Sequence, residues 1–343
     1  MRLLQAMAGA EVGGAEAFFV RLAIAFANTD IEQRVIIRRD SVRARALRAG
    51  GVEPLELPFG GRMDFRTRPA LQREIDRYKP DIVLSWMSRA SWATPKSERA
   101  DGYKLIARLG GYYDLKYYRH CDYLIGNTED IVEHIAQQGF DRERIVYLPN
   151  FVNPPRRRAI SRIGFDTPLD APLLLAMGRL HENKAFDVLL RALADLPDTW
   201  LWLAGEGPEA ASLSKLAAEL GVEDRVRFLG WRDDSDALMQ ACDVFVCPSR
   251  HEPLGNIVLE AWAAEKPVVA AAAAGPVSLI GEDAAGLVVP VDDPGGLAAG
   301  IRTLIADPAN AARLAVEGRR RYEESYTEKA VVAQYQSFFE RVV

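Results

Sequence analysis

The sequence predicts an α/β protein with two doubly wound parallel sheets, and three observations support this fold class. Short apolar runs alternate with segments of helical period along nearly the whole chain. The length of 343 residues is more than one hydrophobic core usually supports. Prolines and arginines interrupt the alternation at 149–172. We therefore expect a first domain at 1–155 and a second at 156–325, with the final segment 326–343 packing back on the first.

Seven apolar segments of the first half are predicted to form buried strands. Each is a short run of valine, isoleucine, leucine or aromatic residues, as is typical of strands covered on both faces. Segments of helical period lie between some of them, at 14–27, 70–78 and 128–138. The expected strands are 2–7, 33–38, 53–57, 82–86, 104–108, 123–126 and 145–148.

The second half repeats this pattern and ends in a helix expected at 328–342. That helix places Tyr335, Phe338 and Phe339 on one side at helical spacing, which indicates packing rather than binding. Parallel sheets bind ligands beyond the carboxyl ends of their strands, so two such units facing each other favour a two-substrate enzyme, a transferase. The expected strands are 173–177, 200–204, 226–229, 244–247, 267–270 and 287–289.

The composition is that of an ordinary globular protein, with 49% hydrophobic and 27% charged residues. The chain has no run of about 18 apolar residues, and its N-terminus lacks the pattern of a signal peptide, so we expect a cytoplasmic protein. Cys121, Cys242 and Cys247 lack metal-ligand spacing and cannot all pair. They are expected to be reduced and to lie in or beside buried strands.

The charge is distributed unevenly between the two halves. Residues 1–160 carry 26 Lys and Arg against 20 Asp and Glu, whereas the remainder carries 17 against 28. The basic excess is either a solvated surface or a contact with something anionic, such as a phosphorylated glycolipid or the inner face of the cell membrane. Nucleic acid is disfavoured, because the basic runs lack interleaved aromatic residues and a binding motif. The arginines of these runs are Arg34, Arg38, Arg39, Arg43, Arg45 and Arg48, and then Arg62, Arg66, Arg68, Arg73 and Arg77.

The most informative segment is 244–261, which predicts a buried strand, a loop and a helix. Gly255 lets the backbone approach a ligand closely. The amides of Asn256 and Ile257 begin the helix, whose positive end suits a diphosphate or the charge that develops on a leaving group. The segment therefore predicts an anion site.

Two glutamates flank this anion site. Glu260 lies one helical turn beyond Asn256 and can accept hydrogen bonds from a ribose diol, while Glu252 can meet sugar hydroxyls. Complementing the helix dipole is the alternative interpretation of either carboxylate. Together with Leu254 and Gly255, the pair matches the E-x7-E signature and so resembles the retaining glycosyltransferases of family 4, which have the GT-B fold of two Rossmann-like domains.

The resemblance covers nearly all of residues 172–325. It implies that Arg179 and Lys184 bind the donor diphosphate in place of a metal, and a planar fork beside a point charge suits adjacent phosphates. Ordinary surface charge is the alternative for either residue alone. The resemblance also places Gly205 and Trp231 around the nucleoside. The matching motifs are Gly178-Arg179-Leu180, Lys184, Gly205-Glu206-Gly207-Pro208, Val226-Arg227-Phe228-Leu229-Gly230-Trp231, Cys242-Asp243-Val244 and Glu265-Lys266-Pro267-Val268-Val269-Ala270.

A glycine-rich loop, Gly13-Gly14-Ala15-Glu16, follows the first strand. The family has a similar loop, whose backbone approaches the donor phosphates or the acceptor, so Gly13 and Gly14 are expected at the donor site. A tight turn is the alternative reason for two glycines before a helix. A dinucleotide oxidoreductase is disfavoured, because the sequence has no G-x-G-x-x-G motif there.

The sequence departs from the family pattern at three places. Leu254 replaces the usual phenylalanine and Ala185 the usual glycine, and both changes leave the polar groups in place. Several relatives carry a histidine near the reacting sugar, where this chain has the stretch around Arg108 and Tyr112. We expect those two residues to contact the acceptor, and we assign no catalytic base to the first domain.

Asp234-Ser235-Asp236 resembles the D-x-D metal motif of the other large glycosyltransferase fold. Its place before a short helix instead favours an N-cap with acidic residues in the first turn. We therefore expect no metal and no other cofactor, since the nucleotide sugar itself is a substrate.

The resemblance implies a retaining transfer of a hexose-type sugar from a nucleotide-diphosphate sugar to a glycan or glycolipid. Arg179, Lys184 and the helix start at Gly255 would stabilise the leaving diphosphate, while Glu252 orients the sugar. The stretch 112–118 and the basic first half resemble enzymes that build lipopolysaccharide cores. A non-catalytic nucleotide-sugar-binding protein, a same-fold epimerase and a phosphorylase are the alternatives.

Overall fold

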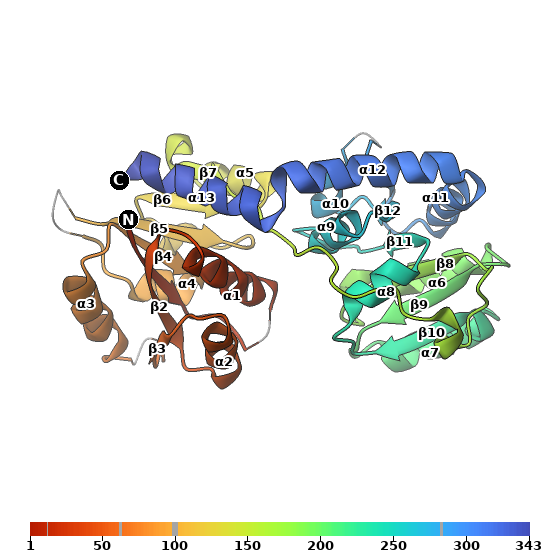
Figure 1. The fold of residues 1–343 in the computed structure, drawn as a ribbon, viewed down its shortest axis with the longest axis horizontal. Coiled ribbons are helices and arrows are strands. Elements are labelled where there is room, and N and C mark those ends of the chain that lie inside the picture. Colours follow the sequence, from red (N-terminus) through yellow and green to blue (C-terminus); the bar gives the residue numbers. More distant parts are fainter. Residues whose placement is uncertain (12, 62–63, 98–101, 282–283) are drawn as a thin grey trace. The chain divides into compact units, whose positions relative to one another are not determined.

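The computed structural model describes residues 1–11, 13–61, 64–97, 102–281 and 284–343 (Figure 1). These residues form two compact units. The first unit is Met1–Asn150 together with Glu328–Val343, and the second is Phe151–Thr327. The chain therefore leaves the first unit once and returns to it at the C-terminus.

The first unit is built on a sheet of seven strands in the order β3-β2-β1-β4-β5-β6-β7. All neighbouring strands pair in parallel, for example with Leu4 beside Arg34 and Val83. Strand order reverses between β1 and β4, which is where open α/β sheets place their ligands. The strands are β1 Arg2–Met7, β2 Glu32–Arg38, β3 Pro54–Leu57, β4 Ile82–Trp86, β5 Lys104–Leu109, β6 Tyr123–Gly126 and β7 Ile145–Tyr147.

The second unit repeats this topology with six parallel strands in the order β10-β9-β8-β11-β12-β13. The predicted fold class, two doubly wound sheets, is confirmed. Each strand expected from the sequence is present, with bounds that differ by a residue or so. The strands are β8 Leu173–Met177, β9 Trp200–Ala204, β10 Val226–Gly230, β11 Val244–Cys247, β12 Val268–Ala271 and β13 Leu287–Val289.

Helices connect the parallel strands and cover both faces of each sheet (Figure 1). Among the described helices, none combines the length and the apolar character that a membrane span requires. The helices of the first unit are α1 Gly14–Ala27, α2 Ser41–Ala49, α3 Thr67–Tyr78, α4 Met87–Ala93, α5 Glu129–Gln137 and α13 Glu328–Val342. Those of the second are α6 Phe186–Ala194, α7 Ala210–Glu219, α8 Ser235–Ala241, α9 Asn256–Ala263, α10 Ala274–Ile280, α11 Pro294–Ala306 and α12 Pro308–Ser325.

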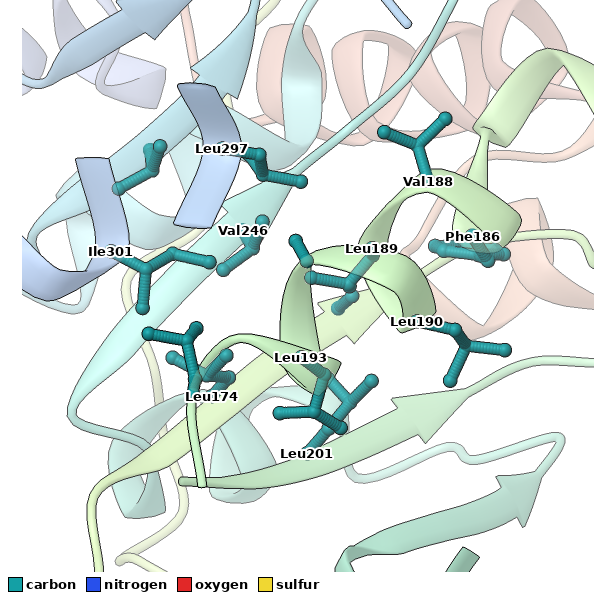
Figure 2. Close-up of a cluster of buried hydrophobic side chains, with 14 of the residues drawn as sticks. Leu174, Phe186, Val188, Leu189, Leu190, Leu193, Leu201, Val246, Leu297 and Ile301 are labelled. Atoms are coloured by element: carbon teal, nitrogen blue, oxygen red, sulfur yellow. The ribbon is translucent and has the colours of Figure 1, made fainter. Parts of the chain in front are cut away.

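One face of the second sheet is covered by α6 and α11 (Figure 2). Leu174 and Val246 of the sheet are at most 1% exposed, as are Leu189 of α6 and Ile301 of α11. Truncating such a leucine to alanine costs about 2–5 kcal/mol. This packed core holds the second sheet rigidly, so the carboxyl ends of its strands have a fixed support.

The last helix, α13, packs on the first unit through aromatic residues, as its spacing predicts. Phe26 of α1 meets Tyr335 edge-on at 5.8 Å between ring centroids and Phe339 at 6.0 Å. Phe338 meets Tyr123 of β6 at 5.7 Å. The final helix is thus part of the first unit's core.

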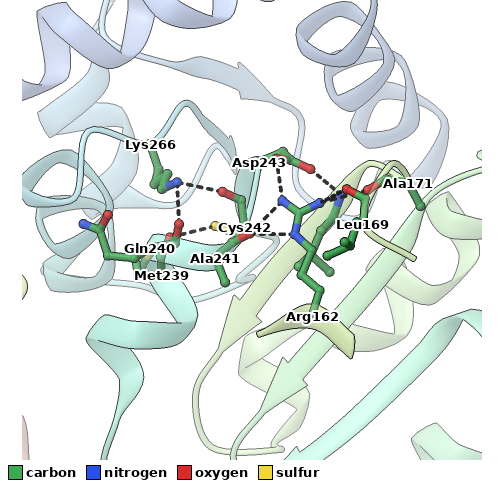
Figure 3. A network of polar contacts seen from close by, with 10 residues as sticks. Arg162, Leu169, Ala171, Met239, Gln240, Ala241, Cys242, Asp243 and Lys266 are labelled. Atoms are coloured by element: carbon green, nitrogen blue, oxygen red, sulfur yellow. Dashed lines mark hydrogen bonds and ion pairs between the residues drawn. The ribbon is translucent and has the colours of Figure 1, made fainter. Parts of the chain in front are cut away.

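The proline- and arginine-rich stretch after the first unit is anchored to the second unit (Figure 3). Arg162 donates to the carbonyl of Ala241 at 2.7 Å and to Asp243 at 2.6 Å. Lys266 donates to the carbonyl of Cys242 at 2.8 Å in the same network. The stretch that interrupts the predicted alternation is therefore part of the second unit, to which its side chains bond.

The three cysteines are buried and unpaired, as the sequence predicts. Burial raises the pKa of the Cys121 and Cys242 thiols to about 12. Neutral thiols at physiological pH are poor nucleophiles and poor metal ligands.

Some arginines of the two basic runs form ion pairs within the first unit. Arg43 is 5% exposed and pairs with Asp40 at 3.1 Å, and Arg34 pairs with Glu74 at 3.2 Å. Arg62 of the second run lies outside the described residues. Only part of the basic excess is therefore available to an anionic partner.

Candidate active site

The carboxyl ends of β8, β9 and β10 meet in a closely packed group of glycines. The amide of Gly205 donates to the carbonyl of Gly230 at 2.8 Å. A β-carbon on Gly205 would lie 1.8 Å from the carbonyl oxygen of Gly178. The φ angles of Gly205 and Gly178 are +141° and +152°, which side chains rarely allow. Gly205 is buried and Gly178 and Gly230 are half-buried, so the glycines allow close backbone packing at the edge where parallel sheets bind ligands.

Lys184 and Glu252 form an ion pair that joins the loop after β8 to the loop after β11. The Lys184 ammonium donates to the Glu252 carboxylate, and their side chains are 26% and 12% exposed. The Lys184 chain crosses Gly178, with Cε 3.3 Å from the position of a β-carbon there. The pair places a cation suited to phosphate and a carboxylate suited to hydroxyls beside the glycine group.

Cys247 lies at the end of β11, close to this ion pair. Burial first, and the charge of Glu252 second, raise the pKa of its thiol to about 11. The thiol therefore stays protonated at neutral pH and serves as a small packing group.

Arg179 and Trp231 are exposed at the same sheet edge. Arg179 directly follows Gly178, and Trp231 is 74% exposed after the end of β10. The backbone amide of Trp231 donates to the carboxylate of Glu206 at 3.4 Å. Both side chains are accessible to a ligand, and Glu206 holds the Trp231 loop, a role that the sequence did not reveal.

Gly255 is the N-cap of α9 and adopts the left-handed region, with φ of +66°. A β-carbon there would lie 2.7 Å from Leu279, and one on Gly275 would lie 2.6 Å from the carbonyl oxygen of Glu252. The amide of Gly275 donates to that carbonyl at 2.8 Å. The start of α10 therefore fixes the loop that carries Glu252, and Gly275 is a site residue missed by the sequence interpretation.

The remaining residues expected at the donor site lie on or beside α9. Leu254, Asn256, Ile257 and Glu260 are all half-buried. Gly255 provides no side-chain cap for the helix, and the amide of Val258 donates to the carbonyl of Gly255 at 2.8 Å. The arrangement is suited to bind an anion at this helix start.

Arg250 lies in the loop after β11, two residues before Glu252, and anchors that loop to neighbouring elements. Its guanidinium donates to both carboxylate oxygens of Asp187 at 2.9 and 2.8 Å and to Asp292 at 2.5 Å. A further bond reaches the carbonyl of Glu182 at 2.7 Å. Burial alone would raise the pKa of Asp187, but the hydrogen bonds and charge of Arg250 lower it. The sequence interpretation missed this clamp, although Arg250 lies two residues before Glu252.

The two acidic residues of the D-x-D-like motif are each held by protein groups. Asp234 occupies the N-cap position of α8, as predicted, but pairs with Arg232 at 2.8 and 2.6 Å instead of capping the helix. Asp236 accepts from the amides of Arg156 and Arg157 at 2.9 and 3.0 Å. Over the described part of the chain, no cluster of three metal-ligating side chains occurs.

Gly13 and Gly14 lie in the first unit, where Gly13 is the N-cap of α1 and Gly14 is its first residue. Glu16 of α1 is 6% exposed and accepts from the amide of Ala10 at 2.8 Å. A β-carbon on Gly13 would lie 2.3 Å from the Glu16 carboxylate, whereas one on Gly14 would meet nothing within 4 Å. Gly13 thus serves the packing of the loop, and Gly14 leaves open backbone.

The structure places Arg108 in the interior, in contrast to the expected contact with an acceptor. It is 1% exposed and donates to the hydroxyl of Tyr335 at 2.9 Å and to the side chain of Asn150. Its guanidinium stacks 4.6 Å from the ring of Phe18 and 4.8 Å from that of Trp86. Arg108 therefore ties α13 to β5.

Tyr112 is accessible, with 42% of its surface exposed. Its hydroxyl donates to Asp130, and its ring meets His134 edge-on at 5.1 Å. Burial, and then the hydrogen bond to Asp130, raise the pKa of Tyr112 to about 12. The hydroxyl is therefore neutral and able to hydrogen-bond with a ligand.

Comparisons with known proteins decide the family. Two family models match the chain: Glycosyltransferase Family 4 over residues 12–156 and Glycosyl transferases group 1 over residues 158–321. The lipopolysaccharide core biosynthesis glycosyltransferase LpsE of Rhizobium meliloti (strain 1021) is 39% identical over 330 residues, 94% of each chain. The chain belongs to glycosyltransferase family 4. The lipopolysaccharide core biosynthesis glycosyltransferase LpsD of the same strain is 35% identical over 350 aligned positions, 100% of this chain and 99% of LpsD.

A solved structure supports the same fold for this family 4 glycosyltransferase. Anabaena Alr3699/HepE in complex with UDP and glucose superposes with a TM-score of 0.82 and covers 99% of this chain and 100% of its own, at 21% identity. The fold is therefore GT-B. The expected donor-site residues of the second unit gather at one sheet edge of the glycosyltransferase, whereas Gly13, Gly14, Arg108 and Tyr112 belong to the first unit.

Proposed function

We propose that this family 4 glycosyltransferase binds a nucleotide-diphosphate sugar at the carboxyl edge of its second sheet and transfers a hexose-type sugar with retention. The observation that carries the proposal is the Lys184–Glu252 pair beside the bare backbone of Gly178. A cation next to close-approach backbone suits the diphosphate, and the carboxylate suits the sugar hydroxyls.

In this proposal, positive groups of the protein stabilise the charge that develops on the leaving diphosphate. Lys184 and the exposed Arg179 supply two full charges, and the start of α9 supplies aligned amides. The reaction then requires no metal, in keeping with the protein partners that Asp234 and Asp236 already have. Glu260 hydrogen-bonds the ribose, and Trp231 packs near the base.

We further propose that the acceptor is a glycan or glycolipid of the cell envelope, met at the cytoplasmic face of the membrane. Support comes from LpsE and LpsD, which are named for lipopolysaccharide core biosynthesis. The basic first half is compatible with an anionic acceptor, and Tyr112 offers an exposed hydroxyl and ring for it. Because HepE was solved with UDP and with UDP-glucose, uridine donors are the first to test.

The test is a thermal-shift screen of the full chain against UDP, GDP and ADP sugars in the presence of a metal chelator. We expect selective stabilisation by one nucleotide class, lost in Arg179→Ala and in Glu260→Ala. Arg191→Ala serves as the matched control, because Arg191 is an exposed arginine of the same unit on α6. Binding that needs a divalent metal, or that survives both site substitutions, would contradict the assignment.

A further inference from the structure

An exposed phenylalanine of the first unit, Phe65, lies beside an aspartate that accepts several backbone hydrogen bonds. Phe65 follows β3 and is 83% exposed. The carboxylate of Asp64 accepts from the amides of Gly60 at 2.7 Å, Arg66 at 2.9 Å and Thr67 at 3.0 Å. The hydroxyl of Thr67, followed by these amides, lowers the pKa of Asp64 to about 2. These bonds tie Asp64 to Gly60 and to the start of α3, and the neighbouring Phe65 side chain lies in solvent.

Backbone strain accompanies this display. Phe59 adopts φ of +44°, an outlier for a bulky residue, and is 1% exposed. Its amide donates to the Thr67 hydroxyl at 2.9 Å, and its carbonyl accepts from Arg89 of α4 at 3.3 Å. Strain of this kind persists where the surroundings enforce it, and it concentrates at functional sites.

A pocket of about 320 Å³ lies between this loop and α4. Its walls follow the carboxyl ends of β3 and β4, on the side of a parallel sheet where ligands bind. Trp92 of α4 is 44% exposed, so two exposed aromatic side chains, Phe65 and Trp92, border one pocket. The lining includes Phe59, Phe65, Pro69 and Trp92 together with Arg68 and Arg89.

Arginines outnumber acidic residues in the lining of this apolar pocket. Arg68 and Arg89 line it, and Arg66 is exposed directly beside Phe65. Asp64 also lines the pocket, but its carboxylate oxygens already accept hydrogen bonds from the amides of Gly60 and Arg66. Apolar side chains bordered by arginines suit an amphiphile whose head is anionic, because the chain needs apolar surface and the head needs cations.

We infer that this pocket binds an anionic lipid of the membrane surface. The apolar part of the lipid contacts Phe65 and Trp92, and its phosphate meets Arg68 and Arg89. The inference rests on the proposed function in one respect, because a glycolipid acceptor brings the enzyme to a membrane. It assigns the membrane contact to one defined loop rather than to the basic surface as a whole.

Co-sedimentation of the full chain with vesicles tests the inference. One set of vesicles is phosphatidylcholine, and the other also contains phosphatidylglycerol. We expect binding to the anionic set, lowered at least about tenfold by Phe65→Ser and about fivefold by Arg68→Ala. Ile163→Ser is the control, because Ile163 is 64% exposed in the second unit, and it should change binding by less than about twofold.

The outcomes separate this inference from the proposed function. Unchanged vesicle binding in Phe65→Ser, or an equal loss in Ile163→Ser, would overturn the lipid site whatever the donor screen shows. Equal binding of the unsubstituted chain to both vesicle sets would overturn it as well. Donor stabilisation measured on the same samples should be unaffected by Phe65→Ser, which also shows that the variant is folded. Loss of donor binding in Arg179→Ala with vesicle binding intact supports both proposals.

Discussion

Replacing Gly205 with alanine tests whether the glycine group at the sheet edge is sterically required. The added β-carbon would lie 1.8 Å from the Gly178 carbonyl oxygen, so the two backbones must separate by roughly 1 Å or more. Such backbone shifts cost about 1–3 kcal/mol, and an alanine at φ of +141° adds about 1–2 kcal/mol. We expect the free energy of unfolding to fall by about 3–4 kcal/mol.

Gly221→Ala is the matched control for this prediction. Gly221 also has a positive φ, +63°, and lies in the same unit, but a β-carbon there would meet nothing within 4 Å. Gly221→Ala should lower the free energy of unfolding by only about 1 kcal/mol, because it places alanine at a positive φ without a steric clash. Urea unfolding gives both values, and titration with the donor found in the screen reports the site. Equal losses of stability in the two variants, or full donor affinity in Gly205→Ala, would refute the steric argument.

Three further substitutions probe other contacts. Arg250→Lys removes the bidentate grip on Asp187, and we expect the donor KM to rise about tenfold; kinetics with unchanged KM would count against a positioning role. The lowered pKa of Asp64 contributes stability that is complete above pH about 4 and lost as the pH falls towards 2. Between those two pH values, the free energy of unfolding of Asp64→Asn should therefore depend less on pH than that of the unsubstituted protein. Arg108→Met leaves the Tyr335 hydroxyl without its donor, and we expect a loss of about 3 kcal/mol with faster amide exchange in α13. Unchanged exchange there would contradict the anchoring role.

The strands could be predicted because parallel strands covered on both faces are continuous apolar runs. β8 and β11 illustrate this, since their buried leucines and valines stand out against polar flanks. Two short helices, α2 and α4, were harder to predict from the sequence. The polar, arginine-rich α2 gives little apolar periodicity, and α4 begins directly after β4 at Met87, which has φ of +69° and no turn signal before it.

The candidate donor site could be proposed from the sequence because its residues lie at strand ends and in one loop–helix segment. The ion pair of Lys184 with Glu252 and the grip of Arg250 on Asp187 could not, because they join positions more than sixty residues apart. Arg108 shows the limit most clearly. Its burial depends on Tyr335, 227 residues later in the chain, and no local pattern reports such a partner.

The return of α13 to the first unit has a consequence for synthesis of the protein on the ribosome. Tyr335 and Phe339 complete the aromatic layer on Phe26, and Tyr335 also bonds to the interior Arg108. A nascent chain that ends before Glu328 has the entire first sheet but lacks this layer. The second unit, Phe151–Thr327, is one continuous segment of the chain, so it can fold as soon as it has been synthesised. The part of the protein that is translated first is therefore the part whose folding ends last.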